Sequence, residues 1–234
     1  MVYQIPVEIV RKNIKNIHLG IYPPEGRVRI SVPFHITDDN IRLAIVSKLS
    51  WIKKRQLEFQ NQPRQTLREY ISGESHYYKG KRYILEVVEK YGKHSLILKN
   101  NAKMLMSVKP DTTTSNKEKV LHEWYRNRLK EDISVLIEKW QPIIGKTPHS
   151  WGVKKMRTKW GSCNIRDRRI WINLELAKKS PECLEYILVH ELVHLHERHH
   201  NDNFRLFMDK FLPHWRKSRD QLKNEPLAHE DWQY

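Results

Sequence analysis

Cysteine is scarce in this chain, with two residues in 234, and no Cys-x-x-Cys pair occurs. We therefore expect no disulfide framework, and we interpret Cys163 and Cys183 as small buried residues. The chain also has no apolar run near the roughly 20 residues of a membrane span. Its first residues lack the apolar stretch of a signal peptide. Together these absences predict a cytoplasmic protein with no membrane partner.

Internal repeats and long low-complexity tracts are also absent, and 39% hydrophobic residues suffice for one or two domains with a core. A polar connector at 110–116 separates two kinds of pattern. Before it, residues 14–21 and 27–32 predict a hairpin, residues 38–59 predict one long helix, and short strands follow. After it, residues 118–140 predict a second long helix. We expect an α+β fold with a β-rich region at 1–112 and a helical domain at 113–234.

The sequence His190-Glu191-Leu192-Val193-His194 is the strongest chemical signal in the chain. Residues four apart lie on the same face of an α-helix, so His190 and His194 can reach one metal ion. Zn²⁺ accepts neutral imidazole ligands and leaves a position for water in catalytic sites. Glu191 can accept a proton from that water. The pattern therefore predicts a zinc site with Glu191 as general base.

The residues around this motif predict that it lies on a buried helix. Ser180 is a suitable N-cap, and Pro181 suits the first helical position. Leucine and isoleucine recur at helical spacing from Leu184 to Leu195. Buried ionisable groups are costly unless they are paired or bound to metal. The alternative is a helix whose histidines only form hydrogen bonds to the backbone.

The third ligand must come from beyond the motif. In a continuous helix, His200 would lie about 15 Å along the axis from His190, too far to share an ion. We therefore expect the helix to end between about Leu195 and Arg198 and the chain to reverse. Asn201, Asp202 and Asn203 suit the start of a new helix. Alternative ligands or neighbours of the site are the following: His196, Glu197, His199 and Asp209.

The run HELVHLHERHHNDNFRLF resembles the active-site signature of the YgjP-like metallopeptidases, a zincin family related to SprT-type proteases. Upstream, the segment Met156–Cys163, ending in Trp-Gly-Ser-Cys, and the run Ile172-Asn173-Leu174 are similar to further elements of that family. Downstream, Pro213-His214-Trp215 is similar to another. The resemblance implies a zincin-like catalytic half. It also implies that His190, His194 and His200 bind Zn²⁺, that Glu191 is the catalytic base and that Phe204 packs beside them.

Two upstream segments, 153–158 and 169–174, have strand patterns and are separated by a polar segment at 164–168. We expect them to be adjacent strands of a hairpin leading into the motif helix. By resemblance to zincins, the 169–174 strand is the candidate for pairing with an extended substrate. The alternative is an ordinary sheet strand without a substrate role. Oxyanion-stabilising candidates are the following: Arg157, Lys159, His199 and His214.

The net charge of +16 is unevenly distributed. Residues 1–150 carry 27 Lys and Arg against 15 Asp and Glu, whereas residues 151–234 carry 16 against 12. A basic region with interspersed aromatics is compatible with a nucleic-acid partner. It is equally compatible with solubility or with acidic protein substrates. No helix-turn-helix, zinc-finger or RNA-binding motif favours the first interpretation.

The sequence thus supports two classes of function. The favoured one is a zinc metallopeptidase that hydrolyses protein or peptide substrates through a metal-activated water, with Glu191 as general base. The alternative is a nucleic-acid-associated protein with a structural or vestigial zinc site. A closed fourth coordination position would favour the alternative, and an open one would favour hydrolysis.

Overall fold

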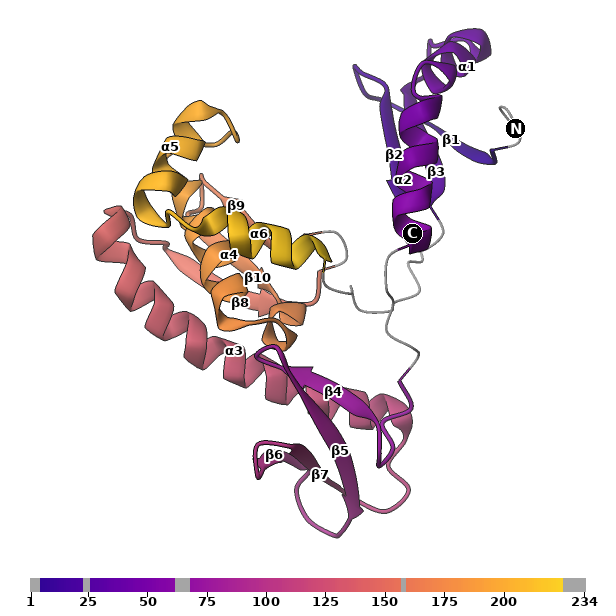
Figure 1. Cartoon of the computed structure of the whole chain (residues 1–234). Helices are drawn as coiled ribbons and strands as arrows, with labels where there is room; N and C mark the ends of the chain where they lie inside the picture. The colour runs from indigo at the N-terminus through magenta and orange to yellow at the C-terminus, as the bar shows by residue number, and fades with distance from the viewer. Residues whose placement is uncertain (1–4, 23–25, 62–67, 157–158, 225–234) are drawn as a thin grey trace. The chain divides into compact units, whose positions relative to one another are not determined.

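The computed structural model describes residues 5–22, 26–61, 68–156 and 159–224. They form two compact units that divide between residues 67 and 68, each with its own hydrophobic core. Figure 1 shows the chain with its helices and strands labelled. The fold is α+β, as expected. No helix in these ranges has the length and apolar character needed to cross a membrane.

The first unit is a three-stranded sheet with two helices. Its elements are β1 (Val7–Lys12), β2 (His18–Tyr22), β3 (Arg27–Pro33), α1 (Asp38–Val46) and α2 (Leu49–Asn61). The sheet has the order β1-β3-β2, in which β2 and β3 are antiparallel and β1 is parallel to β3. The predicted hairpin is therefore confirmed. Its core is aliphatic and comprises Ile5, Val28, Ile30, Val32, Ile41, Ile45 and Ile52.

The single helix expected at 38–59 is wrong, because the chain turns between α1 and α2. The Thr37 side chain accepts a hydrogen bond from the backbone N–H of Asn40 and begins α1. At the other end the Ser47 hydroxyl donates to the carbonyl of Ala44 (2.9 Å). A serine that bonds to a nearby carbonyl competes with helix continuation, which favours the break at this point.

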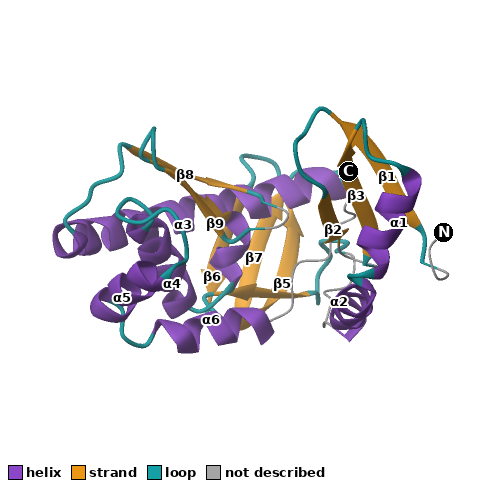
Figure 2. Ribbon diagram, turned by 90° about the horizontal axis from the view of Figure 1, so that it is seen from above, coloured by secondary structure: helices purple, strands orange, loops and turns teal. Residues whose placement is uncertain are grey.

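The second unit begins with a four-stranded sheet. Its strands are β4 (Ser75–Tyr78), β5 (Lys81–Glu89), β6 (Ser95–Lys99) and β7 (Lys103–Val108), in the order β4-β5-β7-β6. Only the β5–β7 pair is parallel. The expected short strands in this region are confirmed. Helix α3 (Thr114–Ile144) follows and contacts strand β6, strand β8 (Ser150–Lys154) and helix α4 (Pro181–Val193) (Figure 2). It also contacts the short 3₁₀ helix η1 (Leu174–Lys178).

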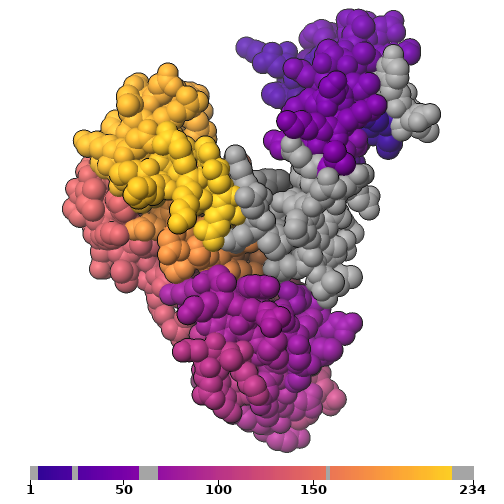
Figure 3. Space-filling view, in the orientation of Figure 1, coloured from indigo at the N-terminus to yellow at the C-terminus, as the bar shows by residue number. Residues whose placement is uncertain are grey.

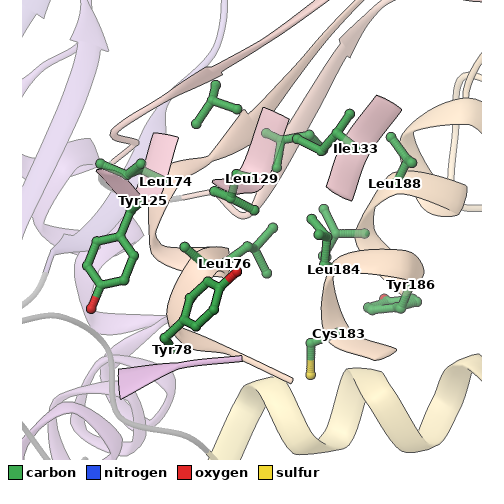
Figure 4. Close-up of a cluster of buried hydrophobic side chains, with 14 of the residues drawn as sticks. Tyr78, Tyr125, Leu129, Ile133, Leu174, Leu176, Cys183, Leu184, Tyr186 and Leu188 are labelled. Atoms are coloured by element: carbon green, nitrogen blue, oxygen red, sulfur yellow. The ribbon is translucent and has the colours of Figure 1, made fainter. Parts of the chain in front are cut away.

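Helix α3 is longer than the predicted 118–140. The Thr113 side chain accepts a hydrogen bond from the backbone N–H of Asn116, and Gly145 ends the helix in the left-handed conformation (φ 72°). One side chain per turn is buried along its length. These residues are Leu121, Tyr125, Leu129, Ile133, Ile137, Trp140 and Ile144. They pack against residues of the four-stranded sheet and of helix α4, which carries the HELVH motif, in one core (Figure 4).

A second, smaller sheet precedes the motif helix. It contains β8 (Ser150–Lys154), β9 (Gly161–Asn164) and β10 (Arg169–Asn173), in the order β8-β10-β9. The expected hairpin between the strands at 153–158 and 169–174 is wrong, because β8 and β10 are parallel. The hairpin is instead formed by β9 and β10. The polar segment at 164–168 is the turn of this hairpin.

The remaining elements are η1 (Leu174–Lys178), α4 (Pro181–Val193), α5 (Asp202–Phe211) and α6 (Trp215–Asn224). Helices α5 and α6 both pack on α4, and they form the yellow surface in Figure 3. The division of the chain differs from the expected boundary at 112/113. Strands β4–β7 share a core with α3 and α4, so the connector lies inside the second unit.

Candidate metal centre

Helix α4 carries the HELVH motif into the core of the second unit. It begins after Ser180, with Pro181 in the first turn, as expected. The sequence predicted one buried face, but residues around most of the helix are buried. The reason is that α3, the β9–β10 hairpin, α5 and α6 all contact this helix. The motif residues are therefore held on a scaffold that is packed on several sides.

The expected chain reversal after the motif is confirmed. Helix α4 ends at Val193, slightly before the expected end between Leu195 and Arg198. Helix α5 begins after Asn201, whose side-chain carbonyl accepts a hydrogen bond from the N–H of Phe204 (3.0 Å). The reversal brings the Nε2 atom of His200 to 2.9 Å from the Nε2 atom of His190. The Phe204 ring lies 4.7–4.8 Å, centroid to centroid, from the three imidazole rings.

Potential ligand atoms of His190, His194 and His200 lie within 4.8 Å of one another. Nδ1 of His194 is 3.0 Å from the carbonyl oxygen of Glu197, which can only accept, so this nitrogen donates and Nε2 keeps its lone pair. Burial, together with the neighbouring imidazoles, lowers the pKa of His190 to about 3. Burial also lowers the pKa of His194. Neutral imidazoles are the form that binds metal.

This donor set fits Zn²⁺. Zn–N bonds of about 2.0–2.1 Å at tetrahedral angles separate the nitrogens by about 3.3 Å, close to the 2.9 Å between His190 and His200. Among the described residues, no fourth His, Cys, Asp or Glu joins the three histidines. Three protein ligands and one open position are typical of catalytic zinc sites rather than structural ones.

Glu191 lies beside the histidines with 5% of its surface exposed. Burial raises the pKa of this carboxyl to about 8, although the nearby Lys159 charge opposes the shift. Strand β9 approaches it closely at Gly161. A Cβ atom added to Gly161 would lie 2.5 Å from Oε1 of Glu191, so only glycine leaves room for the carboxylate in this position. No local sequence pattern indicated this role of the Trp-Gly-Ser-Cys segment.

An open cleft of about 1340 Å³ runs past the three histidines and Glu191. Strand β9 and the turn after it form one wall. β9 is an edge strand, whereas β10 is paired on both sides. The expectation that the 169–174 strand pairs with substrate is therefore wrong, because its backbone groups are already used. Cys163 was expected to be buried but is half-exposed on this wall, whereas Cys183 is buried as predicted.

Asn173 fixes the loop that leads into this wall. Its side-chain amide donates to the carbonyl oxygens of Met156 (2.9 Å) and Lys159 (2.8 Å), and its backbone N–H donates to Trp160. Its Oδ1 accepts from the N–H of Glu175 (3.2 Å). Asn173 is only 4% exposed, so these bonds are shielded from water. Sequence showed Asn173 only as part of a family-like run and gave no signal for this network.

The other residues considered from sequence lie outside the histidine cluster. The Glu197 carboxylate accepts from the N–H of His199, which is exposed. Asp209 accepts from Trp215 Nε1 (2.8 Å) and pairs with Arg216. His196 bonds to the carbonyl of Ile144, 2.8 Å away, and His214 is exposed. Arg157 lies outside the described residues.

Comparison with known proteins identifies the family. No curated protein matches the chain significantly. The solved structures include the metallopeptidase zymogen of Pyrococcus abyssi abylysin, which is 20% identical, with a TM-score of 0.36, covering 38% of this chain and 90% of that one. The profile of the YgjP-like metallopeptidase domain matches residues 15–225. Because this match spans most of both units, the chain belongs to the YgjP-like metallopeptidase family.

Proposed function

We propose that this protein is a zinc-dependent peptidase of the zincin type, with His190, His194 and His200 as the ligands. The observation that carries the proposal is a buried carboxylate, Glu191, beside three clustered imidazoles in an open cleft. A bound Zn²⁺ would polarise the scissile carbonyl and increase the acidity of a water molecule. Family membership supports a metallopeptidase in general.

Glu191 supplies the proton transfers. Its raised pKa makes the carboxylate a stronger base than an exposed glutamate, so it accepts a proton from water more readily. The same group can then donate that proton to the leaving nitrogen of the cleaved peptide bond. Because Gly161 has no side chain, the carboxylate can lie directly against strand β9. Glu191 is thus the general base and acid in this proposal.

Strand β9 is the element that binds substrate in this proposal. Its outer edge has no strand partner, and the strand lines the cleft. An extended peptide can therefore form main-chain hydrogen bonds with it, as in other cases of β-augmentation. Of the oxyanion-stabilising candidates in the described part of the chain, Lys159 alone lines the cleft.

The decisive experiment separates metal binding from catalysis. Glu191→Gln should retain stoichiometric zinc, measured by elemental analysis, and lose about 10²–10⁴-fold in turnover of a casein or peptide-library substrate. Glu182→Gln, at the exposed start of the same helix, is the matched control and should keep full turnover. Undiminished turnover by Glu191→Gln would end the proposed mechanism.

The rival interpretation is a nucleic-acid-associated protein with a structural or vestigial zinc site. A structural site requires four protein ligands. The described residues place only three candidate ligands together, which favours the peptidase. The two also differ in the effect of His194→Ala. If the protein is a peptidase, this variant should lose both zinc and turnover. Under the rival interpretation, the unmodified protein itself has no turnover.

A further inference from the structure

The rim of the cleft carries three positively charged side chains. Lys159, Arg166 and Arg198 line it and are all exposed. Within the described ranges, none of the three side chains forms an ion pair with a carboxylate. The acidic residue on the rim, Asp167, is already held by Arg169 (3.1 Å) and by the side-chain amide of Asn164 (2.8 Å).

Two of these cations flank strand β9 along the chain, and the third lines the same cleft. Lys159 precedes the strand and Arg166 follows it, so one cation stands at each end. The four residues of β9 span about 13 Å at the usual rise per residue. Arg198 belongs to the chain reversal between α4 and α5, beside the histidines. Because Gly161 abuts Glu191, the Lys159 end of β9 is the end nearest the reacting atoms.

The backbone that carries the cation at the reacting end is fixed in place. The carbonyl of Lys159 accepts the 2.8 Å hydrogen bond from Asn173, whose amide is buried. The backbone from which this side chain extends is therefore positioned by the sheet. A peptide with acidic side chains near the scissile bond would meet cations on both sides of it, whereas a basic peptide would meet like charges.

We propose that the cleft selects peptide segments with acidic side chains on both sides of the scissile bond, through Lys159, Arg166 and Arg198. This inference rests on the proposed peptidase function and names its substrate class. The competing explanation is the net charge of +16, which would attract any acidic peptide to any face of the protein. The two explanations differ because only the first assigns the preference to particular side chains.

The test compares three short fluorogenic peptides that differ only in their flanking residues, which are Glu, Gln or Lys. We expect kcat/KM to decrease in that order for the unmodified protein. Arg166→Glu and Arg198→Glu should each lower the Glu-to-Lys ratio by about 2- to 10-fold, since an exposed pair contributes little and reversal adds repulsion. The change should appear in KM, because these side chains bind substrate and do not transfer protons.

Arg82→Glu is the matched control. Arg82 is exposed on β5, away from the cleft, and its substitution changes the net charge by the same amount. It should leave the ratio within about 1.5-fold of the unmodified protein, since distant exposed charges are screened beyond a Debye length of about 8–10 Å. An equal loss of preference in Arg82→Glu and Arg166→Glu would overturn the proposal in favour of net charge.

A binding measurement separates this proposal from the peptidase function. Fluorescence anisotropy of the same peptides with zinc-loaded Glu191→Gln protein requires no hydrolysis. If the Glu peptide binds best and Arg166→Glu and Arg198→Glu each reduce that preference, the role of the three cations is supported even where no cleavage occurs. If the protein cleaves or binds all three peptides equally, the rim has no selective role, and the peptidase function stands on its own evidence.

Discussion

Gly161→Ala tests whether the close approach of β9 positions the general base. The added Cβ would lie 2.5 Å from Oε1, 2.7 Å from Cγ and 2.9 Å from Cδ of Glu191. Ordinary contact begins near 3.4 Å, so the carboxylate must move by about 0.9 Å. The backbone of Gly161 is not among the left-handed glycines, so alanine is otherwise permitted there.

A displacement of about 1 Å in a catalytic group costs about 10²-fold in rate. This corresponds to about 2.7 kcal/mol in activation free energy. We therefore expect kcat of Gly161→Ala to fall about 100-fold while zinc content stays stoichiometric, because the three atoms nearest the added Cβ all belong to Glu191, which is not a proposed ligand. The assay is steady-state turnover with elemental analysis and thermal unfolding of the same preparation.

Gly152→Ala provides the matched control on the parallel strand β8. Its added Cβ would meet Trp171 at 2.5 Å, an equally close clash in the same sheet that does not involve Glu191. Overpacking of this kind costs about 1–3 kcal/mol of stability. Both variants should have a lower melting temperature than the unmodified protein, but only Gly161→Ala should have a reduced kcat. Retention of more than half of kcat by Gly161→Ala, or an equal loss in Gly152→Ala, would refute the positioning role.

Three further predictions concern the metal and pH. Removing zinc with a chelator should lower the melting temperature without unfolding the protein. The reason is that a ligand at 100 times its Kd adds about 2.7 kcal/mol to the free energy of unfolding. An unchanged melting temperature would contradict metal binding. His200→Ala should lose zinc and His199→Ala should retain it, as elemental analysis would show. Burial lowers the pKa of His76 to about 4, so the unfolded chain binds more protons between pH 6.5 and 4. The free energy of unfolding should therefore decrease as the pH is lowered from 6.5 to 4. Urea titrations of His76→Gln should show a smaller decrease over the same pH interval.

The sequence predicted the parts of this site that depend on local geometry. The four-residue spacing of His190 and His194 determines that they share a helix face. The distance along a continuous helix required a reversal before His200, and Asn201 supplied the cap for the next helix. The rise per residue and capping preferences are enough to predict the shared helix face and the chain reversal, without knowledge of the rest of the fold.

The parts that depend on distant pairing were not predicted. Gly161 contacts Glu191 across 30 positions of sequence, and no local pattern specifies that contact. The strand at β9 is only four residues long and contains Gly and Asn, which have low strand preference. Because β9 was not predicted, the 169–174 strand was the candidate for pairing with substrate. The connector at 110–116 was interpreted as a domain boundary because composition does not reveal a shared core.

The shared core has a consequence for cooperativity. Helix α3 has 31 residues, about 46 Å at 1.5 Å per residue, and it contacts strands of both sheets and helix α4. Loss of the four-stranded sheet would expose the buried row of α3, and α3 in turn covers the helix that holds the histidines. The second unit should therefore unfold in a single transition. Substitutions in β5 or β7, far from the cleft, then alter the fraction of molecules with an intact metal site.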